Sequence, residues 1–254
     1  MEVEYEKQDR LAIITLNRPE ARNAVNGALA RRMEEILDAY ESDPALWVAI
    51  LTANGPAFCA GADLKEIAAG RGNELSTAKG GFAGLVKRDR KKPLIAAVTG
   101  SALAGGTEIA LACDMIVCST DTNFGLPEVK RSLVAGAGGI FRLPRVIGMA
   151  PALEVIMTGD PLPAQRAYQL GMVNQVVAAS EVMQSAKSLA ARVMAAAPIA
   201  VQESRGVAIR AFNDDDETLW RASSKAFEIV AKTDDFKEGP RAFIEKRAPK
   251  WRGR

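Results

Sequence analysis

The hydrophobic and polar positions of the chain change period several times, and each change marks an expected element. Glu2–Lys7 and Leu11–Asn17 alternate apolar and polar residues on either side of a short polar turn, which predicts two paired strands. Asn26 favours a helix N-cap, and apolar positions at helical spacing follow it at Leu29, Met33, Ile36, Leu37 and Tyr40. Trp47–Leu51 is then a short apolar run, typical of a buried strand.

Glycine steps interrupt this pattern twice, each time between an expected strand and an expected helix. Pro93–Val98 predicts a strand, and a tight turn through Ala104, Gly105 and Gly106 leads into a helix over Glu108–Cys113. Thr52–Glu66 repeats the order, with Gly61 and Ala62 at the start of its helix. The free N–H groups of two helix starts can together hold one ligand oxygen, so the pattern indicates an oxyanion site.

The alternation of strands and helices from residue 47 to 118, which ends with a strand at Met115–Cys118, favours parallel strands with crossover helices. A glycine-rich turn at 135–139 follows. The last third is mostly helical apart from a short strand over Met172–Val177, with helices expected over 149–158, 163–170, 180–196, 199–212, 217–231 and 234–247. The coarse expectation is an α/β core followed by a helical tail.

The composition excludes several kinds of chemistry. With 254 residues and 48% hydrophobic content the chain can bury a sizeable core, and it has no apolar run long enough to span a bilayer and no signal-peptide pattern. We therefore expect a cytoplasmic protein with no membrane contact. Histidine is absent, which excludes Ser-His and Cys-His pairs and His-ligated zinc, and no metal site is predicted. The three cysteines are expected to be reduced and packed.

Proton transfer must then fall mainly to carboxylates or to Lys and Tyr. Glu108 would lie in the first turn of its helix and can act as a base there, although a glutamate that only complements the helix dipole fits the same position. Glu128 directly follows Pro127, and on its own it is a solvated loop carboxylate. Asp63 and Glu66 have the spacing of a helix cap and its reciprocal partner, so we assign them to capping.

Two further stretches have polar composition. Gly70–Gly81 is rich in small polar residues and predicts a mobile loop, of the kind that often borders a substrate entrance. Lys87–Lys92, KRDRKK, is a dense basic cluster whose simplest interpretation is the solvated end of a helix. A phosphate contact or a nucleic-acid contact are the alternatives, and the lack of interleaved aromatic residues weakens the second.

Five segments together resemble the crotonase family, the enoyl-CoA hydratase/isomerase superfamily, along nearly the whole chain. They are LNRPEARNAVN (16–26), FCAGADLKE (58–66), KPLIAAVTGSALAGGTEIALACD (92–114), FGLPEVKRSLVAGAGGIFRLPR (124–145) and EGPRAFIEKRAP (238–249). The resemblance implies an α/β fold of repeated ββα units in approximately perpendicular sheets, over residues 1–195. It also implies an α-helical C-terminal region, 196–254, that assembles homotrimers or hexamers.

The resemblance further implies a coenzyme A thioester substrate and no cofactor beyond the coenzyme A that the substrate carries. The two N–H groups of the family's oxyanion hole correspond here to Ala62 and Gly105, and the two hydratase glutamates to Glu108 and Glu128. Water activation is assigned to both glutamates, with Glu128 as the proton donor to the α-carbon. Further substrate or CoA contacts are expected, the last two across a subunit interface, at Ala60, Asp63, Leu64, Phe243 and Lys246.

The sequence departs from the family at several positions. Ala135 stands where many hydratases have proline, and Gly136 stands where some isomerases have aspartate, which argues against that isomerase subgroup. Ala104 and Thr107 replace residues that are often glycine and cysteine. The main hypothesis is an enoyl-CoA hydratase acting on a trans-2-enoyl-CoA. A double-bond isomerase, a carnitinyl-CoA dehydratase-like enzyme for a branched or polar acyl group, and a non-catalytic acyl-CoA or nucleic-acid binding protein remain as alternatives.

Overall fold

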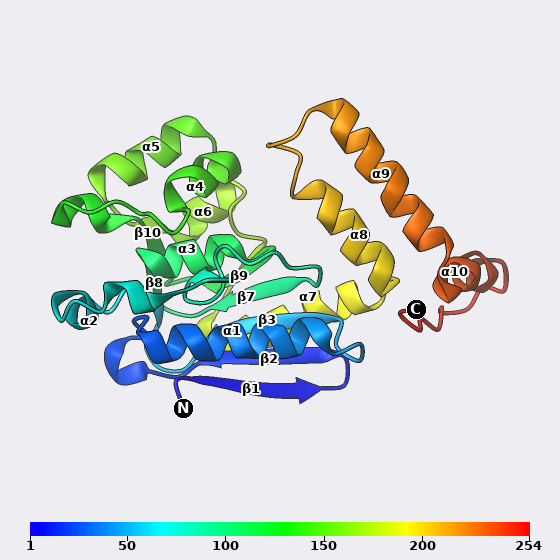
Figure 1. The fold of residues 1–254 in the computed structure, drawn as a ribbon, viewed down its shortest axis with the longest axis horizontal. Helices are drawn as coiled ribbons and strands as arrows, with labels where there is room; N and C mark the ends of the chain where they lie inside the picture. Colours follow the sequence, from blue (N-terminus) through cyan, green and yellow to red (C-terminus); the bar gives the residue numbers. More distant parts are fainter.

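The first two strands form the predicted hairpin and begin the larger of two main sheets. In the computed structural model, which describes residues 1–254, β1 (Val3–Gln8) pairs antiparallel with β2 (Leu11–Leu16). The sheet continues with parallel strands in the order β1-β2-β3-β7-β9-β12 (Figure 1), where the later strands are β3 (Val48–Ala53), β7 (Leu94–Val98), β9 (Met115–Ser119) and β12 (Gln175–Val177). The expectation of parallel strands is confirmed.

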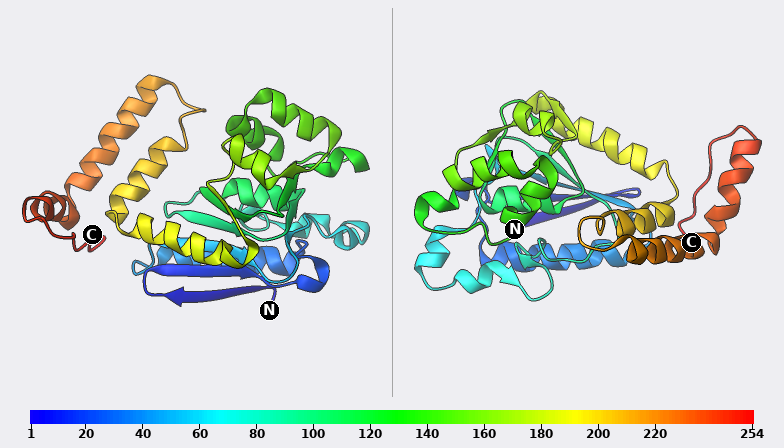
Figure 2. Two further views of the ribbon diagram at one scale, coloured as in Figure 1. Left: turned by 180° about the vertical axis from the view of Figure 1, so that it is seen from behind. Right: turned by 90° about the horizontal axis from the view of Figure 1, so that it is seen from above.

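The larger sheet is covered on both faces because its strands carry apolar side chains on both sides. Ile14 faces the main core of 40 buried residues, to which α1 (Gly27–Ser42) contributes its apolar stripe. Ile13 faces the opposite side, where a cluster of 12 buried residues packs the sheet against α7 (Val182–Met194) (Figure 2). The predicted cap of α1 is confirmed, since the Asn26 side chain accepts a hydrogen bond of 2.8 Å from the Leu29 N–H.

The smaller sheet contains a strand that the sequence pattern did not predict. Its order is β11-β10-β8-β4, with β4 (Ala57–Cys59), β8 (Ser101–Leu103), β10 (Asn123–Gly125) and β11 (Leu162–Pro163). The sequence predicted a strand that leads through one tight turn directly into a helix, and this prediction is wrong. The chain turns at Gly100, with φ +69°, forms β8 and only then enters α3 (Gly105–Ala112). Gly100 is required because an added Cβ would lie 2.2 Å from the Pro56 carbonyl oxygen.

Short elements occupy much of the stretch that was expected to be a mobile loop. After α2 (Leu64–Ala68), a turn of 3-10 helix, η2 (Gly72–Leu75), leads into a small hairpin of β5 (Ser76–Thr77) and β6 (Gly81–Phe82). Leu75 is buried in the main core. The middle of the chain then adds helical segments on the side of the smaller sheet, namely η3 (Pro127–Arg131), α4 (Gly139–Ile147), α5 (Met149–Thr158) and α6 (Ala164–Gln169).

The last three helices extend away from the sheets. A short 3-10 turn, η4 (Ala179–Glu181), precedes α7, and η1 (Pro19–Ala21) lies near the N-terminus. α8 (Pro198–Ala208), α9 (Asp216–Ala231) and α10 (Asp234–Ile244) then form an arm that continues from the end of α7, with α10 on the far side of the molecule from α2 (Figures 1 and 2). The expected division between residues 195 and 196 falls in the link between α7 and α8. None of the helices combines the length and apolar character needed to cross a bilayer.

The basic cluster Lys87–Lys92 is not the solvated end of a helix. Its residues lie in irregular chain before β7, and Arg88, Arg90 and Lys92 are buried. The Lys92 ammonium donates to the Tyr40 carbonyl at 2.8 Å and to the Asp43 carbonyl at 2.6 Å, so it caps the C-terminal end of α1. The prediction failed because alternate residues of the cluster point inward to partners that are distant in sequence.

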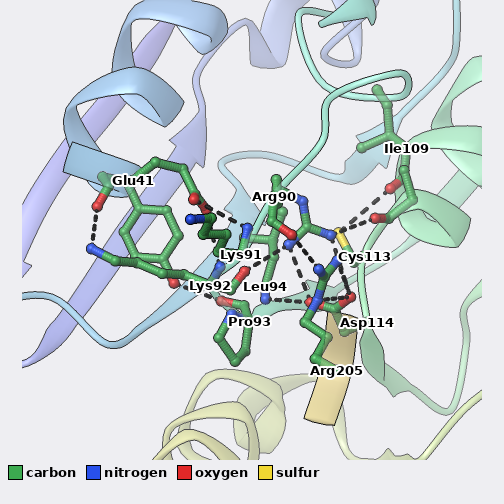
Figure 3. A network of polar contacts seen from close by, with 12 residues as sticks. Glu41, Arg90, Lys91, Lys92, Pro93, Leu94, Ile109, Cys113, Asp114 and Arg205 are labelled. Atoms are coloured by element: carbon green, nitrogen blue, oxygen red, sulfur yellow. Dashed lines mark hydrogen bonds and ion pairs between the residues drawn. The ribbon is translucent and has the colours of Figure 1, made fainter. Parts of the chain in front are cut away.

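Arg90 forms part of an ion network that connects the core to α8. Asp114, which follows α3, accepts from Arg90 at 3.1 Å, from Arg205 of α8 at 2.8 Å and from the Leu94 N–H at 2.8 Å (Figure 3). Burial would raise the pKa of Asp114, but the two guanidinium groups outweigh burial and the pKa lies below its usual value. The network thus adds stability at neutral pH that is lost on acidification, as Asp114 becomes protonated.

Asp114→Asn is expected to lower the free energy of unfolding by about 3 kcal/mol, because it leaves two guanidinium groups without their counter-charge, Arg90 among them almost fully buried. Urea unfolding at neutral pH and fixed protein concentration measures the loss. Glu217→Gln is the matched control, since it breaks an exposed pair with Arg221 and should cost less than about 1 kcal/mol. Equal losses in the two variants would show that the network contributes no more than a surface ion pair.

The cysteines are unpaired, as expected. Cys59 and Cys118 are buried and Cys113 is partly buried. Burial raises the pKa of Cys59 to about 12, so its thiol stays protonated and unreactive at neutral pH.

Candidate active site

A cleft of about 980 Å³ brings together most of the residues that the sequence marked for chemistry. It lies where the starts of α2 and α3 meet η3 and the segment after it. Seven of the nine predicted site residues line it, namely Ala60, Ala62, Asp63, Leu64, Gly105, Glu108 and Glu128.

The start of α3 and the segment just before α2 lie against each other within this cleft; Gly61 and Ala62 were expected to begin the helix, but α2 begins at Leu64. Gly61 has φ +94°, and a Cβ added to it would lie 2.8 Å from the Ala104 Cβ and 3.0 Å from the Gly105 nitrogen. The Val25 N–H donates to the Gly61 carbonyl and the Asp63 N–H donates to the Val25 carbonyl, so the Ala62 N–H lies between these two bonds and takes part in neither. At the start of α3, the first N–H that donates to a backbone carbonyl is that of Glu108. The N–H groups of Ala62 and Gly105 therefore have no acceptor within the chain, and both line the same cleft.

Close packing fixes the start of α3 in a strained conformation. Ala104 has φ +52° and ψ −125°, a region that costs a residue with a side chain roughly 1–3 kcal/mol. Its N–H donates to the Gly125 carbonyl at 2.9 Å. The buried Thr107 hydroxyl donates to the Ala102 carbonyl at 2.6 Å and accepts from the Gly125 N–H at 2.9 Å. The sequence pattern did not reveal that Thr107 ties α3 to both β8 and β10.

Glu108 is a buried carboxylate in the first turn of α3. The Gly139 N–H donates to its Oε1 at 2.8 Å. Burial raises the pKa of Glu108 to about 7, against the effect of the Gly139 N–H and with a further rise from the nearby Glu128 charge. A carboxyl group with this pKa exchanges protons readily at neutral pH, as a catalytic acid or base must.

Glu128 lies in the first turn of η3, directly after Pro127. Its Oε2 is buried and has no hydrogen-bond partner. Burial raises the pKa of this carboxyl above its usual value, and its own N–H and the Arg131 charge act in the opposite direction. The two glutamates thus differ: an N–H donor favours the ionised form of Glu108, whereas the unpartnered oxygen of Glu128 favours the protonated form.

Asp63 has a structural partner for each of its oxygens. Its carboxylate accepts from the Lys65 N–H at 3.1 Å, which caps α2, and from Arg18 at 3.2 Å. The capping assignment of Asp63 is confirmed, but the reciprocal half is wrong: the Asp63 N–H donates to Val25, and Glu66 pairs with Arg71 at 2.6 Å. Leu64 is exposed at the rim of the cleft.

Phe243 and Lys246 do not reach the cleft of their own chain. Phe243 is 86% exposed at the end of α10, at the opposite side of the molecule from α2 (Figure 1), and Lys246 follows it. Their expected role depends on a neighbouring subunit and stays a prediction.

Comparison with known proteins identifies the family of the chain. The family model described as enoyl-CoA hydratase/isomerase matches residues 6–254. A carnitinyl-CoA dehydratase from Proteus mirabilis (strain HI4320) is 40% identical over 95% of this chain and 94% of its own length.

Two solved structures also resemble this fold. An enoyl-CoA hydratase from Mycobacterium tuberculosis H37Rv has a TM-score of 0.95 at 45% identity, covering 100% of this chain and 99% of that one. A carnitinyl-CoA hydratase from Mycobacterium avium has a TM-score of 0.77 at 41% identity, with coverages of 100% and 99%. The α/β fold and its helical C-terminal region are as expected, and the chain belongs to the enoyl-CoA hydratase/isomerase family.

Proposed function

We propose that this protein is an enoyl-CoA hydratase that adds water across the 2,3 double bond of a trans-2-enoyl-CoA. The observation that carries the proposal is the cleft in which two unused N–H groups, on Ala62 and Gly105, lie together with two glutamates of different environment, Glu108 buried and Glu128 half-buried. The test is whether the protein consumes a conjugated enoyl thioester in water, followed by the loss of the conjugated thioester absorbance.

The reaction develops negative charge on the thioester oxygen, and the two N–H groups are placed to stabilise that charge. One such donor typically contributes about 3 to 4 kcal/mol to transition-state stabilisation. The ionised Glu108 takes a proton from water as the water oxygen bonds to C3, and the π electrons of the double bond move toward the thioester oxygen. The resulting enolate then takes a proton at C2 from Glu128.

After addition Glu108 carries the proton from water and Glu128 has lost its own. Exchange of one proton between the two groups, directly or through solvent, restores the starting state. The pair therefore titrates as a unit, and its pH dependence reports the pair rather than either residue alone.

A dehydratase acting on a polar acyl group is the second candidate, and the carnitinyl-CoA dehydratase relatives at 40–41% identity favour it. The same groups would work in reverse: Glu128 removes the C2 proton and Glu108 protonates the leaving hydroxyl. An isomerase would use the same oxyanion site with a single carboxylate.

The hypothesis of nucleic-acid binding rested on the basic cluster Lys87–Lys92, and the positions of these residues argue against it. Three of the cations in the cluster Lys87–Lys92 are buried in contacts within the chain, so the cluster does not form the exposed basic surface that binding to a phosphate backbone requires. A binding protein without turnover would also have no need for two glutamates in one cleft whose pKa values are both raised by burial, Glu108 and Glu128.

We also propose that the 196–254 region assembles homotrimers, alone or paired as hexamers, of a cytoplasmic enzyme that needs no cofactor beyond the substrate's coenzyme A. α9 has no buried residue, and large apolar side chains are exposed along the arm at Phe212, Trp220, Phe227, Phe243 and Ile244. Such a surface is typical of one that is covered by another subunit.

Light scattering at micromolar concentration is expected to give about three or six times the 27.1 kDa mass of the chain. Charged replacements at Trp220 and Phe227 should shift that mass toward one chain. A wild-type monomer would contradict the proposed assembly, and with it the role of Phe243 and Lys246 across an interface.

A further inference from the structure

The turn before α4 presents its backbone to the Glu108 carboxylate. The N–H groups of Ala137 and Gly139 both favour the ionised form of Glu108, and the Gly139 bond measures 2.8 Å. The space beside this contact is filled, since a Cβ added to Gly139 would lie 3.1 Å from the Glu108 Cγ. The position of the turn therefore decides how well this carboxylate is held.

Arg142, near the start of α4, fixes the position of the Ala137–Gly139 segment through its guanidinium group. Its Nη1 donates to the Ala137 carbonyl at 3.1 Å, and its Nη2 donates to the carbonyl of the buried Val86. The guanidinium lies over Gly138, where an added Cβ would approach Nη1 to 2.1 Å and where φ is +110°. One side chain thus joins the turn to the segment after β6.

The guanidinium has no acidic partner within ion-pair distance, and its charge acts on Glu108. Glu128 of η3 and Arg142 of α4 are the charged groups that act on Glu108, with opposite effects. Burial lowers the pKa of Arg142. Among the neighbouring groups, Glu108 and Cys113 of the α3 segment raise that pKa, whereas Arg145 of α4 and Arg90 of the core lower it. The Arg131 charge lowers the pKa of Glu128, but solvent screens this effect because Arg131 is exposed.

We propose that Arg142 is a positioning residue that keeps the Ala137–Gly139 turn against Glu108 and stabilises the ionised form of that carboxylate, so that the proton of the pair resides on Glu128. The inference rests on the proposed function for its catalytic meaning. The contacts themselves do not depend on that function. Arg142 does not line the cleft, so it acts through Glu108 and not on the substrate.

The first test follows the titration of Glu108 without any substrate. Protein labelled with ¹³C at glutamate carboxyl groups is titrated by NMR, with Glu108→Gln used to assign the signal. The wild-type signal should have its midpoint at about pH 7, and Arg142→Gln should move it upward by about one pH unit, because a nearby cation that favoured the carboxylate is gone. Arg145→Gln removes the same charge from the exposed face of α4 and should leave the midpoint unchanged.

The second test follows turnover against pH. If the pKa of Glu108 rises by that amount, the ionised fraction at pH 7 falls from about half to about one tenth, so kcat should fall about fivefold and the acidic limb should move to higher pH. KM should stay within about twofold because Arg142 makes no contact with the cleft. Arg142→Lys keeps the charge but cannot bond both carbonyls, so its Glu108 midpoint should rise less than in Arg142→Gln, and kcat should still fall below the wild-type value. It also serves as the test variant if Arg142→Gln does not fold.

An unchanged Glu108 midpoint in folded Arg142→Gln, or a fully active Arg142→Lys with the wild-type profile, would overturn the proposal. A wild-type protein that hydrates no enoyl-CoA would overturn the proposed function instead. The NMR titration would still decide whether Arg142 controls Glu108.

Discussion

Glu108→Gln and Glu128→Gln are each expected to lower the turnover of enoyl-CoA hydration by about two to four powers of ten, the usual contribution of a positioned acid or base. Hydration needs a base for water and an acid for C2, so neither group can replace the other. Because the two act as a unit, the double variant should be little worse than the poorer single one. Stopped-flow or steady-state absorbance of the conjugated thioester measures these rates.

Two controls separate chemistry from binding and folding. Glutamine keeps the side-chain volume, so the affinity for a saturated acyl-CoA should change far less than turnover. Glu66→Gln changes a carboxylate in the same cleft that pairs with Arg71 at its exposed rim, and it should keep near-normal turnover. Near-normal hydration by Glu108→Gln would contradict the two-carboxylate mechanism and show that Glu128 alone is sufficient for proton transfer.

Removal of the Gly105 N–H is expected to lower kcat by about a hundredfold or more, since an oxyanion donor contributes about 3 to 4 kcal/mol in the transition state. The structure shows how this variant must be made. A Cβ on Gly105 would lie 2.5 Å from the Phe82 ring, so a simple Gly105→Pro replacement would introduce a collision as well as remove the donor. The replacement is therefore made in a Phe82→Ala background.

The comparison that isolates the donor is between Phe82→Ala/Gly105→Pro and Phe82→Ala/Gly105→Ala. Both carry the added Cβ and the smaller neighbour, but only the proline variant lacks the N–H. Circular dichroism and thermal melting check that both are folded. Equal kcat values in the two would show that the thioester oxygen does not use Gly105. A structure with a bound acyl-CoA would then place that oxygen more than about 3.5 Å from its nitrogen.

Local signals in the sequence were sufficient for much of the fold and for the candidate site. Asn26 and the apolar spacing after it predicted α1 because a cap and a helical stripe are both encoded within a few residues. The start of α3 at Gly105 was recognised for the same reason, whereas α2 begins at Leu64, two residues after the predicted start at Ala62. The three residues of β8 are too few to show an alternation, so the residue pattern did not predict this strand, and more than one sheet was expected only from the family resemblance.

Contacts between distant segments were not predictable from a single sequence. Arg90, Asp114 and Arg205 come from three segments, and the Arg90 and Arg205 partners are 115 residues apart, so the buried cations of Lys87–Lys92 looked like a surface cluster. The contact of Gly139 with Glu108 spans 31 residues and uses a backbone N–H, which leaves no mark in the pattern of residue types. Arg142 was overlooked because its partners are the backbone carbonyls of Ala137 and Val86, which leave no mark in that pattern either.

The most direct test of the hydratase proposal is a panel of trans-2-enoyl-CoA thioesters of increasing chain length, with a carnitine-type acyl-CoA included, followed by absorbance at the conjugated thioester band. We expect that at least one enoyl-CoA loses this absorbance with formation of the 3-hydroxyacyl-CoA, and that Glu108→Gln removes the activity on the same substrate. Wild-type protein that binds these thioesters but leaves the band unchanged for every member, in both the hydration and the dehydration direction, would contradict the hydratase proposal.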